Sequence, residues 1–194
     1  PRLPKGLSPR VVLLANINPV SQLEVLDQCE ADCFSIADTM DIWINGARDA
    51  LDTLLGRIDL LVINDSEARL LAGTNHLIKA GERIQDMGPA YVIIKKGEHG
   101  ALLFGPDRFF TCGAYPLREV RDPTGAGDTF VGALAGSLAR SYAEERFEAL
   151  KRGTVTGTIV AGFTCEAFST TSLEQLTTMD IDDRLEAFRE MTSF

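Results

Sequence analysis

Short apolar runs, each followed by a segment with helical spacing, constrain the fold of this chain more than any other feature. The runs cover residues 11–15, 33–37, 60–63 and 91–94. Between them, apolar residues recur three or four positions apart, as on the buried face of an amphipathic helix. Strands that alternate with helices are typical of βαβ units, in which helices cover both faces of a parallel sheet. The sequence therefore predicts an α/β fold with a mostly parallel sheet.

Further elements are predicted from the same patterns. Helices are expected over residues 19–30, 42–55, 67–71 and 78–87, the third ending at Gly73. Two apolar segments at residues 101–104 and 108–111 flank Gly105-Pro106-Asp107, which predicts an antiparallel hairpin at the edge of the sheet. Two more helices are expected after Thr124, over apolar positions 130–138 and 147–163.

Composition and charge limit the classes of function. A chain of 194 residues with 45% hydrophobic residues can bury a core, so one globular domain over residues 1–194 is expected. Its 28 acidic and 19 basic residues give a formal charge of −9, which repels nucleic acid and anionic membrane surfaces. The longest apolar stretch, residues 11–15, is far too short to span a membrane. We therefore expect a cytoplasmic protein that binds neither nucleic acid nor membranes.

Cysteine usage favours free thiols over disulfides or zinc. The chain has cysteines at positions 29, 33, 112 and 165. A chain with this much apolar content folds without disulfide bonds. Cys29 and Cys33 have a zinc-like spacing, but no second pair lies nearby and the histidines are His76 and His99. We expect free and mostly buried thiols and no zinc site.

A glycine-rich segment before a predicted helix has the features of an anion site. Residues 122–128 read Asp-Pro-Thr-Gly-Ala-Gly-Asp. Free N–H groups and the positive end of the helix dipole meet at a helix N-terminus, and glycine lets a phosphate approach the backbone. Asp128 would be a carboxylate in the first turn, suited to orient a hydroxyl and take its proton. The simpler alternative is a glycine-rich turn with an acidic cap.

Three motifs in order along the chain resemble those of one enzyme family. Residues 122–135, DPTGAGDTFVGALA, fit the C-terminal signature of the PfkB, or ribokinase-like, family of carbohydrate and nucleoside kinases. Residues 64–67 resemble its NxxE motif, and residues 96–100 resemble its glycine-containing loop beside the nucleotide. The resemblance covers residues 11–176. It implies a ribokinase-like three-layer fold and ATP-dependent transfer of a phosphoryl group to a hydroxyl of a sugar or related small molecule.

The resemblance also implies roles for the glycine-rich segment. Asp128 would be the catalytic base that activates the acceptor hydroxyl. Gly125, Ala126 and Gly127 would present backbone N–H groups to the transferring phosphoryl group as an anion hole. Asp122 and Thr124 would help to bind a monovalent cation such as K⁺.

Metal and nucleotide contacts are implied elsewhere in the chain. Asn64 and Glu67 would hold Mg²⁺ through water, because Mg²⁺ keeps much of its hydration shell. The same pair also fits a capping box at a helix start, and the two roles are compatible. Nucleotide contacts are implied for positions on a strand end, on the glycine-containing loop that follows it and on a later helix: Lys95, Lys96, Gly97, Gly100, Thr154, Gly157 and Thr158.

Two acidic residues are candidate neighbours of the acceptor. Asp38 and Asp41 lie in a segment similar to that of sugar-kinase-like family members, at a strand end where α/β folds place ligand contacts. Solvated helix-cap acids are an equal alternative. Sugars, sugar phosphates and nucleosides all remain candidate acceptors.

The sequence departs from the family in its N-terminal part. The family's N-terminal glycine-rich signature and small β lid have no counterpart in residues 1–194. We therefore expect an incomplete domain that is inactive alone and exposes a sheet edge, with a homodimer as one consequence. The alternative function is a non-catalytic nucleotide-binding or scaffold protein derived from a kinase.

Overall fold

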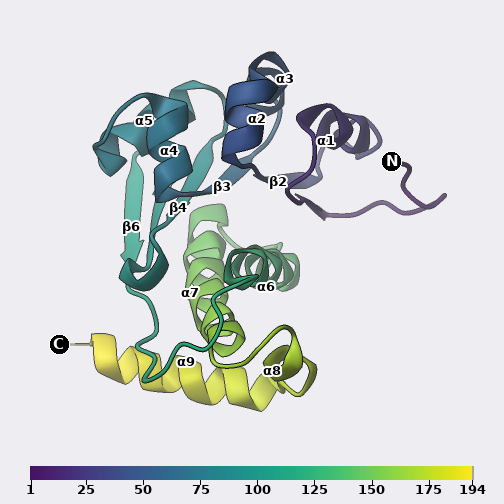
Figure 1. Ribbon diagram of the computed structural model, residues 1–194. Helices are drawn as coiled ribbons and strands as arrows, with labels where there is room; N and C mark the ends of the chain where they lie inside the picture. The colour runs from purple at the N-terminus through teal and green to yellow at the C-terminus, as the bar shows by residue number, and fades with distance from the viewer. Residues whose placement is uncertain (194) are drawn as a thin grey trace. The chain divides into compact units, whose positions relative to one another are not determined.

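Six strands form one sheet within residues 1–193, the part of the chain that the computed structural model describes (Figure 1). Their order in the sheet is their order in the sequence. The strands are β1 (Val11–Leu14), β2 (Phe34–Asp38), β3 (Leu60–Asn64), β4 (Tyr91–Lys95), β5 (Ala101–Gly105) and β6 (Arg108–Cys112). Strands β1 to β4 pair in parallel, and β5 and β6 form the hairpin. The predicted α/β fold with a mostly parallel sheet and an edge hairpin is confirmed.

The chain divides into two compact units. The first unit contains residues 1–96 and 102–110, and the second contains residues 97–101 and the chain from Thr111 onward. Among residues 1–193, no helix combines the length and apolarity that a membrane span requires.

Five helices belong to the described part of the first unit. They are α1 (Pro19–Leu26), α2 (Asp41–Gly46), α3 (Arg48–Leu55), α4 (Asp65–Ala72) and α5 (Leu77–Asp86). Buried side chains of these helices, such as Leu54 and Ile84, form one apolar core with strand residues such as Ile63 and Ile94. All five residues of β2 and the first four of β3 are buried, so these strands are covered on both faces of the sheet.

The predicted helix over residues 42–55 is wrong in one respect, because the structure has two helices there. Ala47 adopts φ −141°, outside the helical region, between α2 and α3. Its N–H donates to the carbonyl of Trp43 and its carbonyl accepts from Leu51, so it closes one helix and starts the next. Gly46, a poor helix former, precedes this break.

The second unit consists mainly of helices. Its elements are the single turn η1 (Gly97–His99), α6 (Ala126–Arg140), α7 (Arg146–Cys165), α8 (Thr171–Glu174) and α9 (Thr178–Thr192). Helices α6 and α7 lie side by side, and α9 lies across the end of α7 (Figure 1). A Cβ atom on Gly157 would lie 2.8 Å from the carbonyl oxygen of Phe130, so the close approach of α6 to α7 requires glycine there.

Two helices after residue 170 were not predicted. Helix α9 begins with a capping box in which Thr177 and Asp180 exchange side-chain hydrogen bonds with each other's backbone. Phe188 is its one buried residue among those described. With so little apolar surface buried, the helix carries only a weak periodic pattern in its sequence.

Candidate active site

Residues 122–128, which we call the glycine turn, lead into α6 and leave the space before its first turn open. Gly125 caps the helix with φ +81°, a left-handed conformation that favours glycine. Its carbonyl accepts the first helical hydrogen bond, 2.9 Å from the Thr129 nitrogen. No side chain caps this helix, and a Cβ on Gly125 would meet no atom within 4 Å. The space in front of the turn is therefore open on the side of Gly125.

Three amides of the turn lack acceptors among the described residues. The Ala126 N–H donates to the Pro123 carbonyl at 3.1 Å. The N–H groups of Gly125, Gly127 and Asp128 have no acceptor in this part of the chain. Free N–H groups at a helix N-terminus bind anions, so these three amides suit a phosphate oxygen. The predicted role of the Ala126 N–H in an anion hole remains a prediction. In this structure that N–H has an acceptor within the turn.

Asp128 is the third residue of α6, and its side chain is exposed. Its carboxylate forms no hydrogen bond or ion pair with another residue in the described part of the chain. The positive end of the helix dipole favours a negative charge at this position. The side chain is thus free to accept a proton from a ligand.

Asp122 organises the entry to the turn. Its Oδ1 accepts a hydrogen bond from the Thr124 N–H at 2.9 Å, and this bond holds the pKa of Asp122 below its ordinary value. The backbone N–H groups of Arg121 and Asp122 both donate to the Cys165 carbonyl, at 2.8 and 3.3 Å. The turn is therefore tied to the end of α7. The predicted role of Asp122 and Thr124 in binding a monovalent cation remains a prediction.

A second set of candidates lies at the carboxyl ends of three parallel strands in the first unit. We call Asp38, Asn64, Glu67 and Lys95 the strand-end cluster. Asp38 ends β2, Asn64 ends β3 and Lys95 ends β4, while Glu67 lies in the first turn of α4. Asn64 pairs with Lys95 in the sheet register. Ligand sites of open α/β sheets lie at this edge.

Asn64 and Glu67 form the capping box that their spacing predicts. The Glu67 N–H donates to Asn64 Oδ1 at 2.8 Å, and the Asn64 N–H donates to Glu67 Oε2 at 3.1 Å. The Ser66 hydroxyl also donates to Asn64 Oδ1, at 2.7 Å. Burial raises the pKa of Glu67, the charge of Asp38 acts in the same direction, and the Asn64 N–H and Lys95 oppose them.

Lys95 and Asp38 form an ion pair in which Nζ lies 3.5 Å from Oδ2. Both side chains are largely buried, with exposed fractions of 17% and 10%. Asp38 Oδ1 also accepts from the Thr39 N–H at 2.8 Å. Lys95, predicted as a nucleotide contact, and Asp38, predicted near the acceptor, are therefore brought together as partners.

The strand-end cluster fits Mg²⁺ only through water. No group of three or more histidine, cysteine or acidic side chains able to hold a metal occurs among residues 1–193. One carboxylate and one amide oxygen leave most positions of an octahedral ion to water or to phosphate, which is how proteins commonly bind Mg²⁺. Glu67 Oε2 and Asn64 Oδ1 already accept backbone hydrogen bonds, so an ordered water is the suitable bridge.

The other predicted contacts before residue 101 are two glycines, a lysine and an acid, and backbone conformation or packing explains the glycines. Gly97 and Gly100 have φ +55° and +81°, and a Cβ on Gly100 would lie 2.0 Å from the Cys112 carbonyl oxygen. Lys96 is half-buried. Asp41 starts α2, and its Oδ1 accepts from the Ile42 N–H at 2.9 Å. The N-cap residue of α2 is Met40 and no side chain caps this helix, so Asp41 is an acid of the first turn, and its place near the acceptor remains a prediction.

The predicted adenine-pocket residues on α7 are buried. Thr154 is fully buried, and its hydroxyl donates to the Leu150 carbonyl of its own helix at 2.8 Å. Gly157 packs against Phe130, and the Thr158 hydroxyl lies 3.9 Å from the Cys112 sulfur. Packing between helices accounts for Gly157, while an adenine contact at these positions remains a prediction.

A family model for the pfkB family of carbohydrate kinases matches residues 11–170. This match covers the three motifs and both sets of candidate residues. The chain belongs to the pfkB family. The family resemblance expected from the motifs is thereby confirmed.

Curated relatives of this pfkB chain include several kinases. It is 27% identical over 137 residues to a cytidine kinase of Thermococcus kodakarensis, covering 69% of this chain and 49% of the relative. It is 29% identical over 147 residues to an aminoimidazole riboside kinase of Salmonella typhimurium, covering 74% and 44%. The chain therefore spans about half the length of the curated relatives it matches.

Solved structures show the same fold. A nucleoside kinase of Methanocaldococcus jannaschii, an archaeal member of the ribokinase family, matches with a TM-score of 0.77 at 19% identity, covering 95% of this chain and 58% of that one. The aminoimidazole riboside kinase of Salmonella enterica, complexed with aminoimidazole riboside and an ATP analog, matches with a TM-score of 0.71 at 21% identity, covering 92% and 65%. The pfkB chain therefore has the ribokinase-like fold.

Sequence reasoning missed Gln22 in α1. Its side chain is 1% exposed, and Nε2 donates to the carbonyls of Leu14, Ala15 and Asp38 at 3.0 Å each. Gln22 thus joins the ends of β1 and β2 beside the strand-end cluster. A polar residue on the sheet-facing side of a predicted amphipathic helix was the available signal.

Proposed function

We propose that this chain carries the phosphate-binding and metal-binding parts of an ATP-dependent phosphotransferase whose acceptor is a hydroxyl of a sugar or riboside. The observation that carries this proposal is the start of α6. There, two amides without acceptors and an unpaired, exposed carboxylate follow one left-handed glycine. Donors for a phosphate and an acceptor for a proton are thus supplied by consecutive residues.

Each residue of the glycine turn has a role in the proposed reaction. The amides of Gly125, Gly127 and Asp128, with that of Ala126 once the turn adapts to a ligand, donate to oxygens of the γ-phosphate. Such donors stabilise charge that spreads over these oxygens in the transition state. Asp128 accepts the proton of the acceptor hydroxyl. At the same time, the oxygen of that hydroxyl forms a bond to the γ-phosphorus. The bond from that phosphorus to the bridging oxygen breaks, and ADP leaves with the electron pair.

The strand-end cluster has a supporting role. Asn64 and Glu67 would hold Mg²⁺ through water, and the ion would supply positive charge to offset that of the phosphates. Lys95 would add positive charge near the phosphates, with Asp38 holding it in place. Lys96, Gly97 and Gly100 are proposed to lie along the nucleotide, and Asp122 and Thr124 to bind K⁺. The proposed acceptor class rests on the relatives, which are named for cytidine, aminoimidazole riboside and fructose.

A screen of sugar and riboside acceptors tests this function in the natural protein that contains these residues. ATP is the donor, and ADP release is measured with each acceptor. Asp128→Asn should lower kcat by ~10²–10⁴, the range for a positioned acid or base, with little change in nucleotide affinity. Asp182→Asn is the matched control, because it removes the same charge from an exposed position on α9.

Two results would contradict the proposal. A kcat unchanged in Asp128→Asn would remove the proposed base. Tight nucleotide binding without transfer to any sugar or riboside would favour the alternative, a non-catalytic nucleotide-binding protein derived from a kinase.

A further inference from the structure

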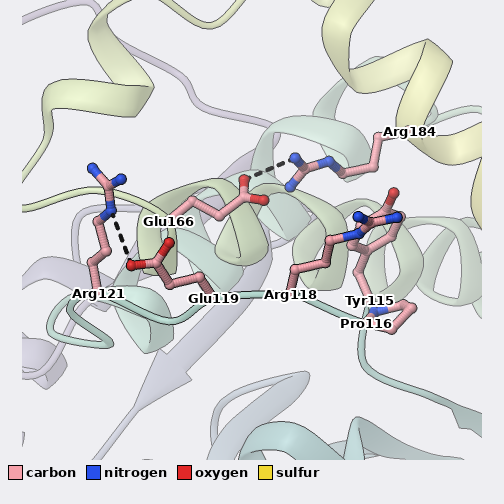
Figure 2. A pocket seen from close by; sticks show the side chains of 7 residues that line it. All are labelled: Tyr115, Pro116, Arg118, Glu119, Arg121, Glu166 and Arg184. Atoms are coloured by element: carbon pink, nitrogen blue, oxygen red, sulfur yellow. Dashed lines mark hydrogen bonds and ion pairs between the residues drawn. The ribbon is translucent and has the colours of Figure 1, made fainter.

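A pocket of about 380 Å³ opens in the second unit, outside the glycine turn (Figure 2). Its walls come from three segments: the loop over residues 115–121, the end of α7 at Glu166, and Arg184 of α9. This volume lies within the range of small-molecule sites. None of the residues proposed above for phosphate, metal or acceptor lines it.

The pocket is positively charged in an acidic protein. Arg118, Arg121 and Arg184 line it together with Glu119 and Glu166, which leaves one net positive charge. The whole chain has a formal charge of −9. A site that concentrates arginines against this background favours anions.

Arg184 is held in a fixed orientation. Its guanidinium carbon lies 3.5 Å from the centre of the Phe163 ring and 4.7 Å from that of Tyr115. Its Nη2 pairs with Glu166 Oε2 at 2.8 Å, and its side chain is 15% exposed. Its Nη1 is enclosed and has no hydrogen-bond acceptor in the described residues. Arg184 therefore keeps an unused donor.

The other two arginines are loosely held. Arg121 lies 3.7 Å from Glu119, and both side chains are more than 60% exposed, so this ion pair is weak (Figure 2). Arg118 forms no ion pair or hydrogen bond with any residue that the structure describes. Its guanidinium group offers all its donors to a ligand.

We propose that this pocket is a second ligand site, which binds a small organic anion through a phosphate or carboxylate group. Arg118 forms a bidentate contact with the oxyanion, and Arg121 adds charge. Arg184 holds its own part of the wall rigid through its ring contacts and its bond to Glu166. Guanidinium groups match the geometry of phosphate and carboxylate oxygens, which explains the choice of anion. The site goes beyond the phosphotransferase reaction and does not depend on it.

Calorimetry on the 194-residue chain tests the site without any nucleotide. Inorganic phosphate and citrate serve as the two probes, with sodium chloride used to hold the ionic strength constant. At least one probe should bind saturably with a Kd below about 10 mM. In ¹⁵N NMR spectra, the same probe should shift arginine Nε–H resonances. Phosphate binding alone or citrate binding alone identifies which oxyanion the pocket takes.

Arg118→Gln and Arg189→Gln form a matched pair of variants. Arg118 is exposed and unpaired, so its loss should leave thermal stability unchanged and weaken binding ~10-fold or more. Arg189 lies on α9 outside the pocket and pairs with Glu186, so Arg189→Gln should change affinity less than about twofold. Equal affinities of the two variants, full competition by chloride, or no saturable binding of either probe would overturn the proposal.

Discussion

Replacing Asn64 and Glu67 one at a time separates a structural role of the strand-end cluster from a metal role. Asn64→Ala removes the acceptor that both the Glu67 N–H and the Ser66 hydroxyl use. Loss of such a cap costs about 1 kcal/mol, which corresponds to a fall in Tm of about 2–4 °C for a chain of this size. Glu67→Gln keeps an oxygen for the Asn64 N–H and removes the charge. Its Tm at neutral pH should therefore match or exceed that of the wild type.

The pH dependence of Glu67→Gln has a definite sign. Burial raises the pKa of Glu67 in the folded protein above its ordinary value of 4.5. The folded state then holds this proton more tightly than the unfolded chain, so the contribution of Glu67 to stability is present at low pH. It is lost as the pH rises through the folded pKa. The Tm of Glu67→Gln relative to wild type should therefore increase as the pH rises above 4.5.

Thermal unfolding across this pH range and Mg²⁺ titrations of nucleotide binding provide the two assays. Glu67→Gln should raise the Mg²⁺ concentration needed for half-maximal nucleotide binding ~10-fold, the usual effect of losing an outer-shell partner. A Tm loss equal to that of Asn64→Ala, with normal Mg²⁺ dependence, would refute the metal role and leave only the capping box.

Two further predictions concern packing and thiol chemistry. Gly157→Ala should destabilise the protein by about 1–3 kcal/mol in denaturant unfolding, because its Cβ would press on the Phe130 backbone. Gly132→Ala, in α6 with open space around its Cβ, should instead stabilise by up to ~1 kcal/mol, and equal signs for both would refute the packing argument. Burial and the neighbouring Cys29 thiol raise the pKa of Cys33 to about 12. Iodoacetamide at mildly alkaline pH should therefore modify the partly exposed Cys29 first, and mass spectrometry showing Cys33 first would contradict this.

The strands could be predicted because burial on both faces leaves continuous apolar runs. Residues 60–63 and 91–94 are such runs, and the structure extends each by only one residue. The break at Ala47 could not be predicted, since the apolar spacing continues through it. Helix α9 was not predicted because Phe188 is its one buried residue among those described.

The candidate site was predictable where its geometry is local. The left-handed Gly125 and the capping box of Asn64 and Glu67 depend on neighbouring residues alone. The pairing of Lys95 with Asp38 depends on the order and register of three strands. The position of Arg184 against Phe163 depends on a helix without a clear sequence pattern.

Nucleotide binding to the 194-residue chain is the most direct test of the glycine turn. Calorimetric titration with ATP and ADP, with and without Mg²⁺, should show saturable binding that Mg²⁺ strengthens. Gly125→Ala, which strains the backbone at φ +81° by roughly 1–2 kcal/mol, should weaken this binding, while Gly132→Ala should preserve it. No Mg²⁺-dependent binding by the folded chain, or equal affinities of the two variants, would contradict the assignment of the phosphate site.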